Sequence, residues 1–193
     1  MPAGEDAGFT LVELCISIAL LGVVTVGLTA VMFTALTADR RTATRLDESR
    51  DIQFVNAYLA DDVQGATSVA TGGTARCGTG TAALELRGVS YDTASLGAQV
   101  TVVSYVLTTS MVDGVATGAL HRYACAAPAS PAPSYPLAPA SDVVVARSLA
   151  TTPPVVTCSP SPCGATTTAV SVALVPVGGG TAVSVGGTRR TTP

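Results

Sequence analysis

The chain has 193 residues, of which 48% are hydrophobic, 4% are aromatic and 12% are charged. Its formal net charge is −3, and all 10 of its basic residues are arginines. This balance offers no clustered basic face of the kind that nucleic-acid binding requires, so no nucleic-acid contact is predicted.

Residues 1–8 form a short polar segment that ends in Gly8 and contains two acids, Glu5 and Asp6. A secretory signal peptide instead begins with basic residues and has an apolar core of roughly 7 to 15 residues, followed by a cleavage site of small residues. The acidic start and the longer apolar run that follows it disfavour such a signal. Residues 1–8 and the apolar run are therefore not interpreted as a secretory signal peptide.

Residues 9–38 form an apolar run in which Glu13 is the one ionisable residue besides the thiol of Cys15. About 20 apolar residues are enough to cross a bilayer, so this segment predicts a transmembrane helix. A carboxylate inside such a segment costs on the order of 2.5 kcal/mol or more, which marks a functional site with a specific partner. Glu13 is the candidate residue of that site, whereas Cys15 reads as a small buried hydrophobe.

Residues 39–66 are more polar, but apolar side chains recur there at steps of three and four, which places them on one helical face. Gly65, Gly72 and Gly73 then supply a stop signal. We therefore predict one long helix from about Phe9 to about Ala66, with an amphipathic second half that packs on a globular head. The residues of the stripe are Ile52, Val55, Leu59, Val63 and Ala66.

Asp61 and Asp62 are adjacent within the predicted helix. No loop of the chain alternates Asp and Asn at the density that a calcium-binding loop uses, so a calcium site is disfavoured. Neighbouring residues on a helix do not share a face, which disfavours a catalytic dyad. The pair is expected to solvate the helix surface, with one of the two facing Arg122.

The remainder, residues 67–193, predicts a β-rich extracytoplasmic head built on an antiparallel sheet. Residues 126–139 are dense in proline, alanine and serine, and proline has no N–H for a strand ladder, so this segment is predicted to be an exposed loop. The predicted strands are short, β-branched segments at residues 83–87, 100–107, 120–125, 143–146, 170–175 and 182–185.

Four cysteines fall within the head, namely Cys77, Cys125, Cys158 and Cys163, and they allow three disulfide pairings. An exported domain lies in an oxidising compartment, which favours disulfides. Because Cys158 and Cys163 close a small proline-containing loop, the pairs Cys158–Cys163 and Cys77–Cys125 are preferred. Zinc is disfavoured because the spacing is wrong and His121 is the one histidine, and no metal or cofactor is predicted.

An enzyme is disfavoured because catalytic signatures are missing from the sequence. It has no Gly-x-Ser-x-Gly elbow, no glycine-rich phosphate loop and no His-Glu-x-x-His zinc helix. His121 stands in a predicted strand, where a lone histidine is more often a surface residue than a base. No catalytic residue is therefore proposed.

The hexapeptide Gly8-Phe9-Thr10-Leu11-Val12-Glu13 resembles the class III signal of type IV pilins and type II secretion pseudopilins. The resemblance implies that a prepilin peptidase cleaves between Gly8 and Phe9 and N-methylates Phe9. It also implies that Glu13 serves assembly, because its carboxylate would meet the charged terminal amine of a neighbouring subunit. Such a pair offsets two charges that are each costly in lipid.

The same resemblance implies an α+β fold in which the long N-terminal helix packs on an antiparallel sheet. Residues 54–66, 104–107 and 120–122 are similar to the minor J-type pseudopilins and to their type IV pilus counterparts, which resemble primers of filament growth. The implied partners are the prepilin peptidase, other pilin or pseudopilin subunits and an inner-membrane assembly platform. The implied location is a single-pass membrane protein with an extracytoplasmic head, and then a surface or periplasmic filament.

An alternative function is a single-pass, membrane-anchored binding module that does not polymerise. It leaves Glu13 and the Gly8–Phe9 pair unexplained, and a Glu13→Ala variant distinguishes it from a filament subunit. The sequence leaves open whether the machine is a secretion system, a pilus or a DNA-uptake pseudopilus.

Overall fold

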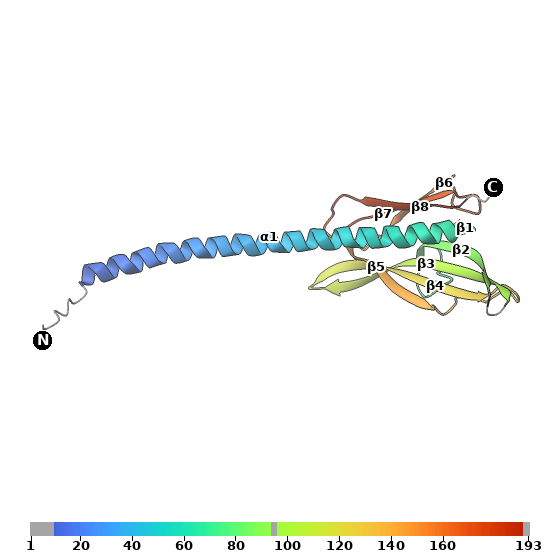
Figure 1. Ribbon diagram of the computed structural model, residues 1–193, viewed down its shortest axis with the longest axis horizontal. Coiled ribbons are helices and arrows are strands. Elements are labelled where there is room, and N and C mark those ends of the chain that lie inside the picture. Colours follow the sequence, from blue (N-terminus) through green and yellow to red (C-terminus); the bar gives the residue numbers. More distant parts are fainter. Residues whose placement is uncertain (1–9, 94–95, 191–193) are drawn as a thin grey trace. The chain divides into compact units, whose positions relative to one another are not determined.

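The computed structural model describes residues 10–93 and 96–190 (Figure 1). The chain forms two compact units, Met1–Leu46 and Asp47–Pro193, and the second unit is called the head below. The elements in chain order are α1 (Leu11–Gly65), β1 (Ser68–Ala70), β2 (Ala82–Asp92), β3 (Gly97–Val112), β4 (Val115–Pro128), β5 (Ser141–Leu149), β6 (Val155–Ser159), β7 (Ala169–Leu174) and β8 (Val183–Thr188).

The described part of the first unit is the start of α1. Leu11–Asp39 is a helical stretch of 29 residues that is long and apolar enough to cross a membrane by length and composition. The fold class predicted from the sequence is confirmed, because a long N-terminal apolar helix continues into a segment packed against an antiparallel sheet. The arrangement is α+β and pilin-like.

The head contains two antiparallel sheets, one of five strands in the order β1-β2-β3-β4-β5 and one of three strands in the order β6-β7-β8. The C-terminal part of α1 lies between them (Figure 1). The sequence predicted an antiparallel sheet but not its division into two. Pro153 and Pro154 separate β5 from β6, and neither has an N–H to extend a ladder, so the chain leaves the first sheet there.

The core of the head forms where α1 meets both sheets. The predicted stripe on α1 is inside, since Val55, Leu59 and Val63 are at most 1% exposed. Burying a large aliphatic side chain contributes about 1.5–3 kcal/mol, so this stripe fixes the helix in the head. The sheets contribute Leu84, Leu86, Tyr105, Leu120, Val145, Ala146, Leu149, Val170, Val172, Leu174 and Val185.

Strand β3 is the central strand of the larger sheet, and its two hairpins turn at opposite ends. The β2–β3 register runs to the pair Asp92 and Gly97, whereas the β3–β4 register runs to Val112 and Val115. The second turn has two residues with positive φ, Asp113 at 50° and Gly114 at 77°. Such Asp-Gly loops match the twist of the flanking strands.

The proline-rich loop begins later than its predicted start at residue 126. Residues 126–128 extend β4, where they pair with residues 99–101 of β3. Pro128 ends the strand, a position at which proline is tolerated. Two short strands, β1 and β6, were missed because segments of three and five residues show too little alternation to be seen in sequence.

We expect Gly187→Ala to destabilise the head by about 1–3 kcal/mol, because β8 crosses α1 too closely for a side chain. A Cβ at this position would lie 3.0 Å from Ala60 Cα and 3.1 Å from Val63 Cβ. Thermal unfolding of the full chain in detergent micelles measures the loss. Gly164→Ala is the control, since its Cβ would meet nothing nearer than an oxygen at 4.0 Å. Equal melting temperatures for the two variants would contradict the prediction.

Candidate functional site

Glu13 lies in the first turn of α1 and forms a reciprocal cap with Thr10. The Glu13 Oε2 atom accepts hydrogen bonds from the Thr10 backbone N–H at 3.2 Å and from the Thr10 hydroxyl at 3.0 Å. The Glu13 backbone N–H donates in turn to Thr10 Oγ1 at 3.3 Å. This is a capping box, in which the two side chains satisfy donors that the helix start would otherwise leave free.

The capping box gives Glu13 a structural role within its own helix. A carboxylate in the first helical turn is also stabilised by the positive end of the helix dipole. The sequence interpretation considered Glu13 alone and missed Thr10, although a Thr-x-x-Glu pattern before an apolar run indicates a capping box. Glu13 therefore has a structural partner within its own chain before any neighbouring subunit is considered.

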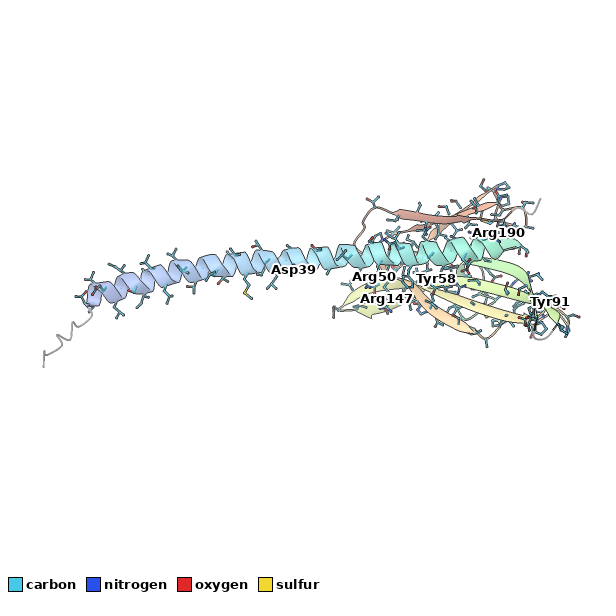
Figure 2. All side chains as sticks on the ribbon, in the orientation of Figure 1. Asp39, Arg50, Tyr58, Tyr91, Arg147 and Arg190 are labelled. Carbon is cyan, nitrogen blue, oxygen red and sulfur yellow. A yellow bond between two sulfur atoms is a disulfide. The ribbon has the colours of Figure 1, made fainter. Side chains whose placement is uncertain are left out.

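The apolar segment that follows Glu13 is exposed along its whole length, and its large side chains stand away from the helix axis (Figure 2). Its hydroxyl groups are satisfied within the helix, because each donates to a carbonyl four residues earlier. The surface of this segment is thus almost entirely hydrocarbon, and it ends at Asp39. The five hydroxyl residues are Ser17, Thr25, Thr29, Thr34 and Thr37.

Two residues of the predicted processing site, Gly8 and Phe9, lie outside the described residues. The described chain begins immediately after them, at Thr10. Cleavage between Gly8 and Phe9 and methylation of Phe9 therefore remain predictions.

In the head, Asp62 on α1 forms an ion pair with Arg122 on β4. Arg122 Nε and Nη2 donate to the two carboxylate oxygens of Asp62 at 2.7 and 2.5 Å. The hydroxyl of Tyr105 on β3 also donates to Asp62, at 2.6 Å. The Arg122 guanidinium lies 5.0 Å from the centre of the Tyr58 ring. This network joins the end of α1 to the middle of the larger sheet.

The side chains of the ion pair are nearly buried, with 6% of Asp62 and 15% of Arg122 exposed. Burial and the Asp62 carboxylate raise the pKa of Tyr105 far above its usual value, and the hydrogen bond to Asp62 raises the pKa of Arg122. Tyr105 thus stays protonated and Arg122 stays charged, as a fixed structural network requires. Asp61 is exposed as expected, whereas Asp62 is buried and faces Arg122.

A groove of about 360 Å³ lies beside this network, between the last turns of α1 and the sheet. Six of its 15 lining residues are glycine or alanine. Gly88 allows the close approach, because a Cβ there would lie 2.7 Å from the Gly65 carbonyl oxygen. The small residues in the lining are Gly65, Ala66, Gly88, Ala124, Ala126 and Ala140.

His121 on β4 pairs with Asp142 on β5. Its Nδ1 lies 2.8 Å from an Asp142 carboxylate oxygen, and its ring stacks on Tyr123 with 5.7 Å between ring centres. Burial, together with the Asp142 charge, raises the pKa of Tyr123. Within the described part of the chain no serine, threonine or cysteine side chain is hydrogen-bonded to His121, so the pair lacks the nucleophile of a catalytic triad.

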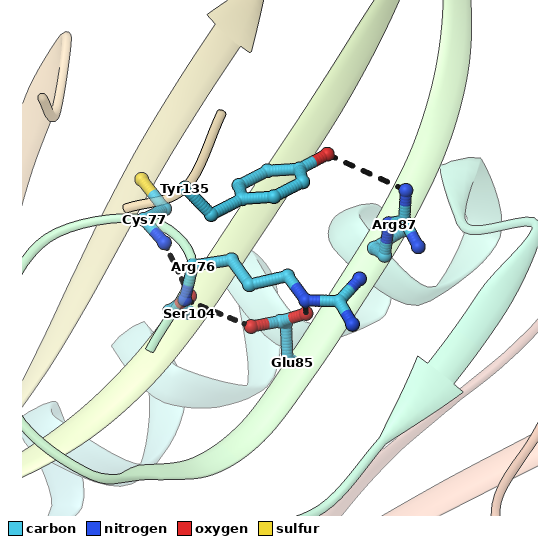
Figure 3. Close-up of polar contacts among 6 residues, drawn as sticks. All are labelled: Arg76, Cys77, Glu85, Arg87, Ser104 and Tyr135. Carbon is cyan, nitrogen blue, oxygen red and sulfur yellow. Dashed lines mark hydrogen bonds and ion pairs between the residues drawn. The ribbon is translucent and has the colours of Figure 1, made fainter. Parts of the chain in front are cut away.

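The four head cysteines form two disulfides, Cys77–Cys125 and Cys158–Cys163. Cys77 lies in the loop before β2, and its backbone N–H donates to the buried Ser104 hydroxyl at 3.3 Å (Figure 3). The first disulfide therefore fastens this loop to β4, and the second closes the loop after β6. Cys15 is a free, exposed thiol on α1.

Comparison with known proteins supports the start of α1 as the functional segment. Residues 5–29 match the family model of the prokaryotic N-terminal methylation motif, and the matched segment contains Gly8, Phe9, Thr10 and Glu13. No curated protein and no solved structure matches the chain. The chain therefore carries a prokaryotic N-terminal methylation motif on an apolar helix, which is the prepilin type of signal found in type IV pilins and pseudopilins.

Proposed function

We propose that this chain is a minor pilin or pseudopilin, a structural subunit of a type IV pilus-like or type II secretion filament. The observation that carries the proposal is one carboxylate, Glu13, at the capped start of a fully exposed apolar helix. A lone acid is costly in a membrane unless it meets a partner. The amine that peptidase cleavage would create at Phe9 is a partner of the right charge and depth.

The proposed mechanism is mechanical. The precursor is held in the membrane by residues 9–38, with its head on the extracytoplasmic side, until the peptidase cleaves after Gly8. Glu13 of one subunit then pairs with the Phe9 amine of a neighbour, which sets the axial position. Packing of the apolar helices supplies most of the cohesion. The chain itself carries out no chemical step, in keeping with a motif that marks structural subunits.

The proposed domains follow this mechanism. Residues 1–8 are the leader, residues 9–38 the membrane and assembly helix, residues 39–66 its amphipathic continuation and residues 67–193 the extracytoplasmic head. The proposed partners are the prepilin peptidase, other pilin or pseudopilin subunits and an inner-membrane assembly platform. The similarity of residues 54–66 to J-type subunits supports a minor role near the filament tip.

Protein recovered from its native membrane is expected to begin at Phe9 and to be one methyl group heavier than the unmodified chain. Intact mass together with amino-terminal sequencing measures both changes. The control is the same protein from cells without prepilin peptidase, in which residues 1–8 should remain.

An uncleaved chain in cells with an active peptidase would overturn the proposal. That result would instead favour a single-pass, membrane-anchored binding module that does not polymerise. In such a module Glu13 would serve the helix cap alone.

A further inference from the structure

The second half of β2 carries a positive charge beside exposed apolar side chains. Arg87, Val89 and Tyr91 alternate along β2, so they share one face of the sheet. Val89 is 60% exposed and Tyr91 is 64% exposed, and Tyr91 lies near the β2–β3 turn (Figure 2). These three residues are called the arginine end. Arginine and tyrosine are enriched where proteins bind one another.

The Arg87 guanidinium has no carboxylate partner among the described residues. Its Nε is buried without an acceptor, and its Nη2 has one long hydrogen bond, 3.4 Å to the Tyr135 hydroxyl (Figure 3). The nearby acid on this face, Glu85, is held by Arg76 through a backbone hydrogen bond of 3.1 Å and an ion pair of 3.6 Å. Asp92 accepts a hydrogen bond from Gln99. The half-buried guanidinium also lies 5.8 Å from the centre of the Tyr135 ring, so Arg87 has an aromatic neighbour but no acid among the described residues.

The opposite end of the same sheet carries the complementary pattern. At the β3–β4 turn the exposed Asp113 is flanked by Met111, Val112 and Val115, which are 70%, 52% and 54% exposed. Across residues 10–93 and 96–190, no hydrogen bond or ion pair is found for the Asp113 carboxylate. These four residues are called the aspartate tip. It presents one uncompensated negative charge within an apolar rim.

Arg87 pairs in register with Val102 of β3, which lies 11 residues before Asp113, so the two charges are about 36 Å apart along the strand at 3.3 Å per residue. A contact between two arginine ends or two aspartate tips would bring like charges together. A contact between the arginine end of one head and the aspartate tip of the next pairs opposite charges and covers apolar side chains on both. Such a contact is heterologous, because it joins unlike surfaces of the two copies.

We propose that the partner of the arginine end is the aspartate tip of a second copy of this chain, with Arg87 pairing with Asp113. This inference rests on the proposed function, since it assigns the contact between heads within the filament. Specificity comes from the single charge pair, and most of the buried area comes from Val89, Tyr91 and the apolar rim of the tip.

The test is site-specific cross-linking of two differently tagged full-length copies in their native membrane. Cys15→Ala removes the free thiol from both copies; one copy then carries Val89→Cys and the other Val112→Cys. Mild oxidation is expected to give a dimer that contains both tags. Copies that both carry Val89→Cys, or both carry Val112→Cys, should stay at the background level, because like ends do not meet.

Charge variants test the pairing itself. Arg87→Gln in the first copy, or Asp113→Asn in the second, is expected to lower the yield of mixed dimer by about two- to fivefold, as for an exposed ion pair. Asparagine tolerates the positive φ of position 113, so the turn is kept. Combining both changes should cause no further loss, because they remove the same pair. Arg147→Gln is the matched control on an exposed arginine, and it should change nothing.

The amino-terminal mass, measured on the same samples, distinguishes a failure of the proposed function from a failure of the head contact. An unprocessed chain would overturn the proposed function. A processed chain that gives no mixed dimer, or that gives equally strong dimers from like ends, would overturn the head contact alone. A yield unaffected by Arg87→Gln and Asp113→Asn would also overturn it.

Discussion

Glu13→Gln is expected to lower filament assembly by about tenfold or more while leaving the start of α1 capped. Glutamine serves as the third residue of a capping box as well as glutamate does, so its amide oxygen still accepts from Thr10. The glutamine side chain carries no negative charge to pair with an amine. An ammonium group left unpaired in an apolar environment costs on the order of 2.5 kcal/mol or more, and each 1.4 kcal/mol corresponds to about tenfold. Counting assembled subunits in sheared filament fractions measures the effect.

The converse variant, Thr10→Ala, keeps the carboxylate and removes the cap. Loss of a capping side chain costs about 1 kcal/mol of helix stability, so assembly should fall much less than with Glu13→Gln. Membrane insertion and peptidase cleavage of both variants should match the unmodified chain. If Glu13→Gln assembled normally and Thr10→Ala did not, the cap would be the role of Glu13 and charge pairing would be excluded.

Arg122→Met is expected to destabilise the head by about 3–5 kcal/mol, because it leaves the Asp62 carboxylate buried without its cation. The Asp62 side chain is 6% exposed, and it loses both hydrogen bonds from Arg122. Methionine keeps much of the arginine volume, and the loss therefore reports the broken pair more than a cavity. Urea titration of the full chain in detergent micelles, followed by circular dichroism of the sheet signal, measures it.

The double variant Asp62→Leu with Arg122→Met should recover part of that stability, because no charge is left buried without a partner, while the Tyr105 hydroxyl loses its acceptor. Asp61→Ala is the matched control, as it removes an exposed acid one residue away and should shift stability by no more than about 0.5 kcal/mol. If the double variant proved no more stable than Arg122→Met alone, the unpaired charge on Asp62 would not be the cause of the loss.

Much of the architecture follows from local patterns in the sequence. Val55, Leu59 and Val63 recur at helical spacing, and all three are buried between the sheets. Each of the six predicted strand segments lies in or overlaps an observed strand, since runs of β-branched residues between turn signals depend little on distant neighbours. For the same reason Glu13 could be singled out, as its environment is set by the residues next to it.

Features that depend on residues far apart in the chain could not be predicted from local sequence patterns. The Asp62–Arg122 pair joins positions 60 residues apart, and sequence spacing offered only the suggestion that one aspartate faces Arg122. The division into two sheets depends on how the chain turns after β5, which the strand patterns do not encode. The separation of Arg87 from Asp113 follows only from the register of β3 with its neighbours.

The internally bonded hydroxyls of α1 have a mechanical consequence for any bundle that these helices form. The hydroxyls of Ser17, Thr25 and Thr29 donate to the backbone of α1 itself, so they have no free donor for a neighbouring helix. Contacts between such helices are therefore mainly dispersive. In the proposed filament, these contacts would let one helix slide along another, and the charge pair of Glu13 would restore the axial position of each helix.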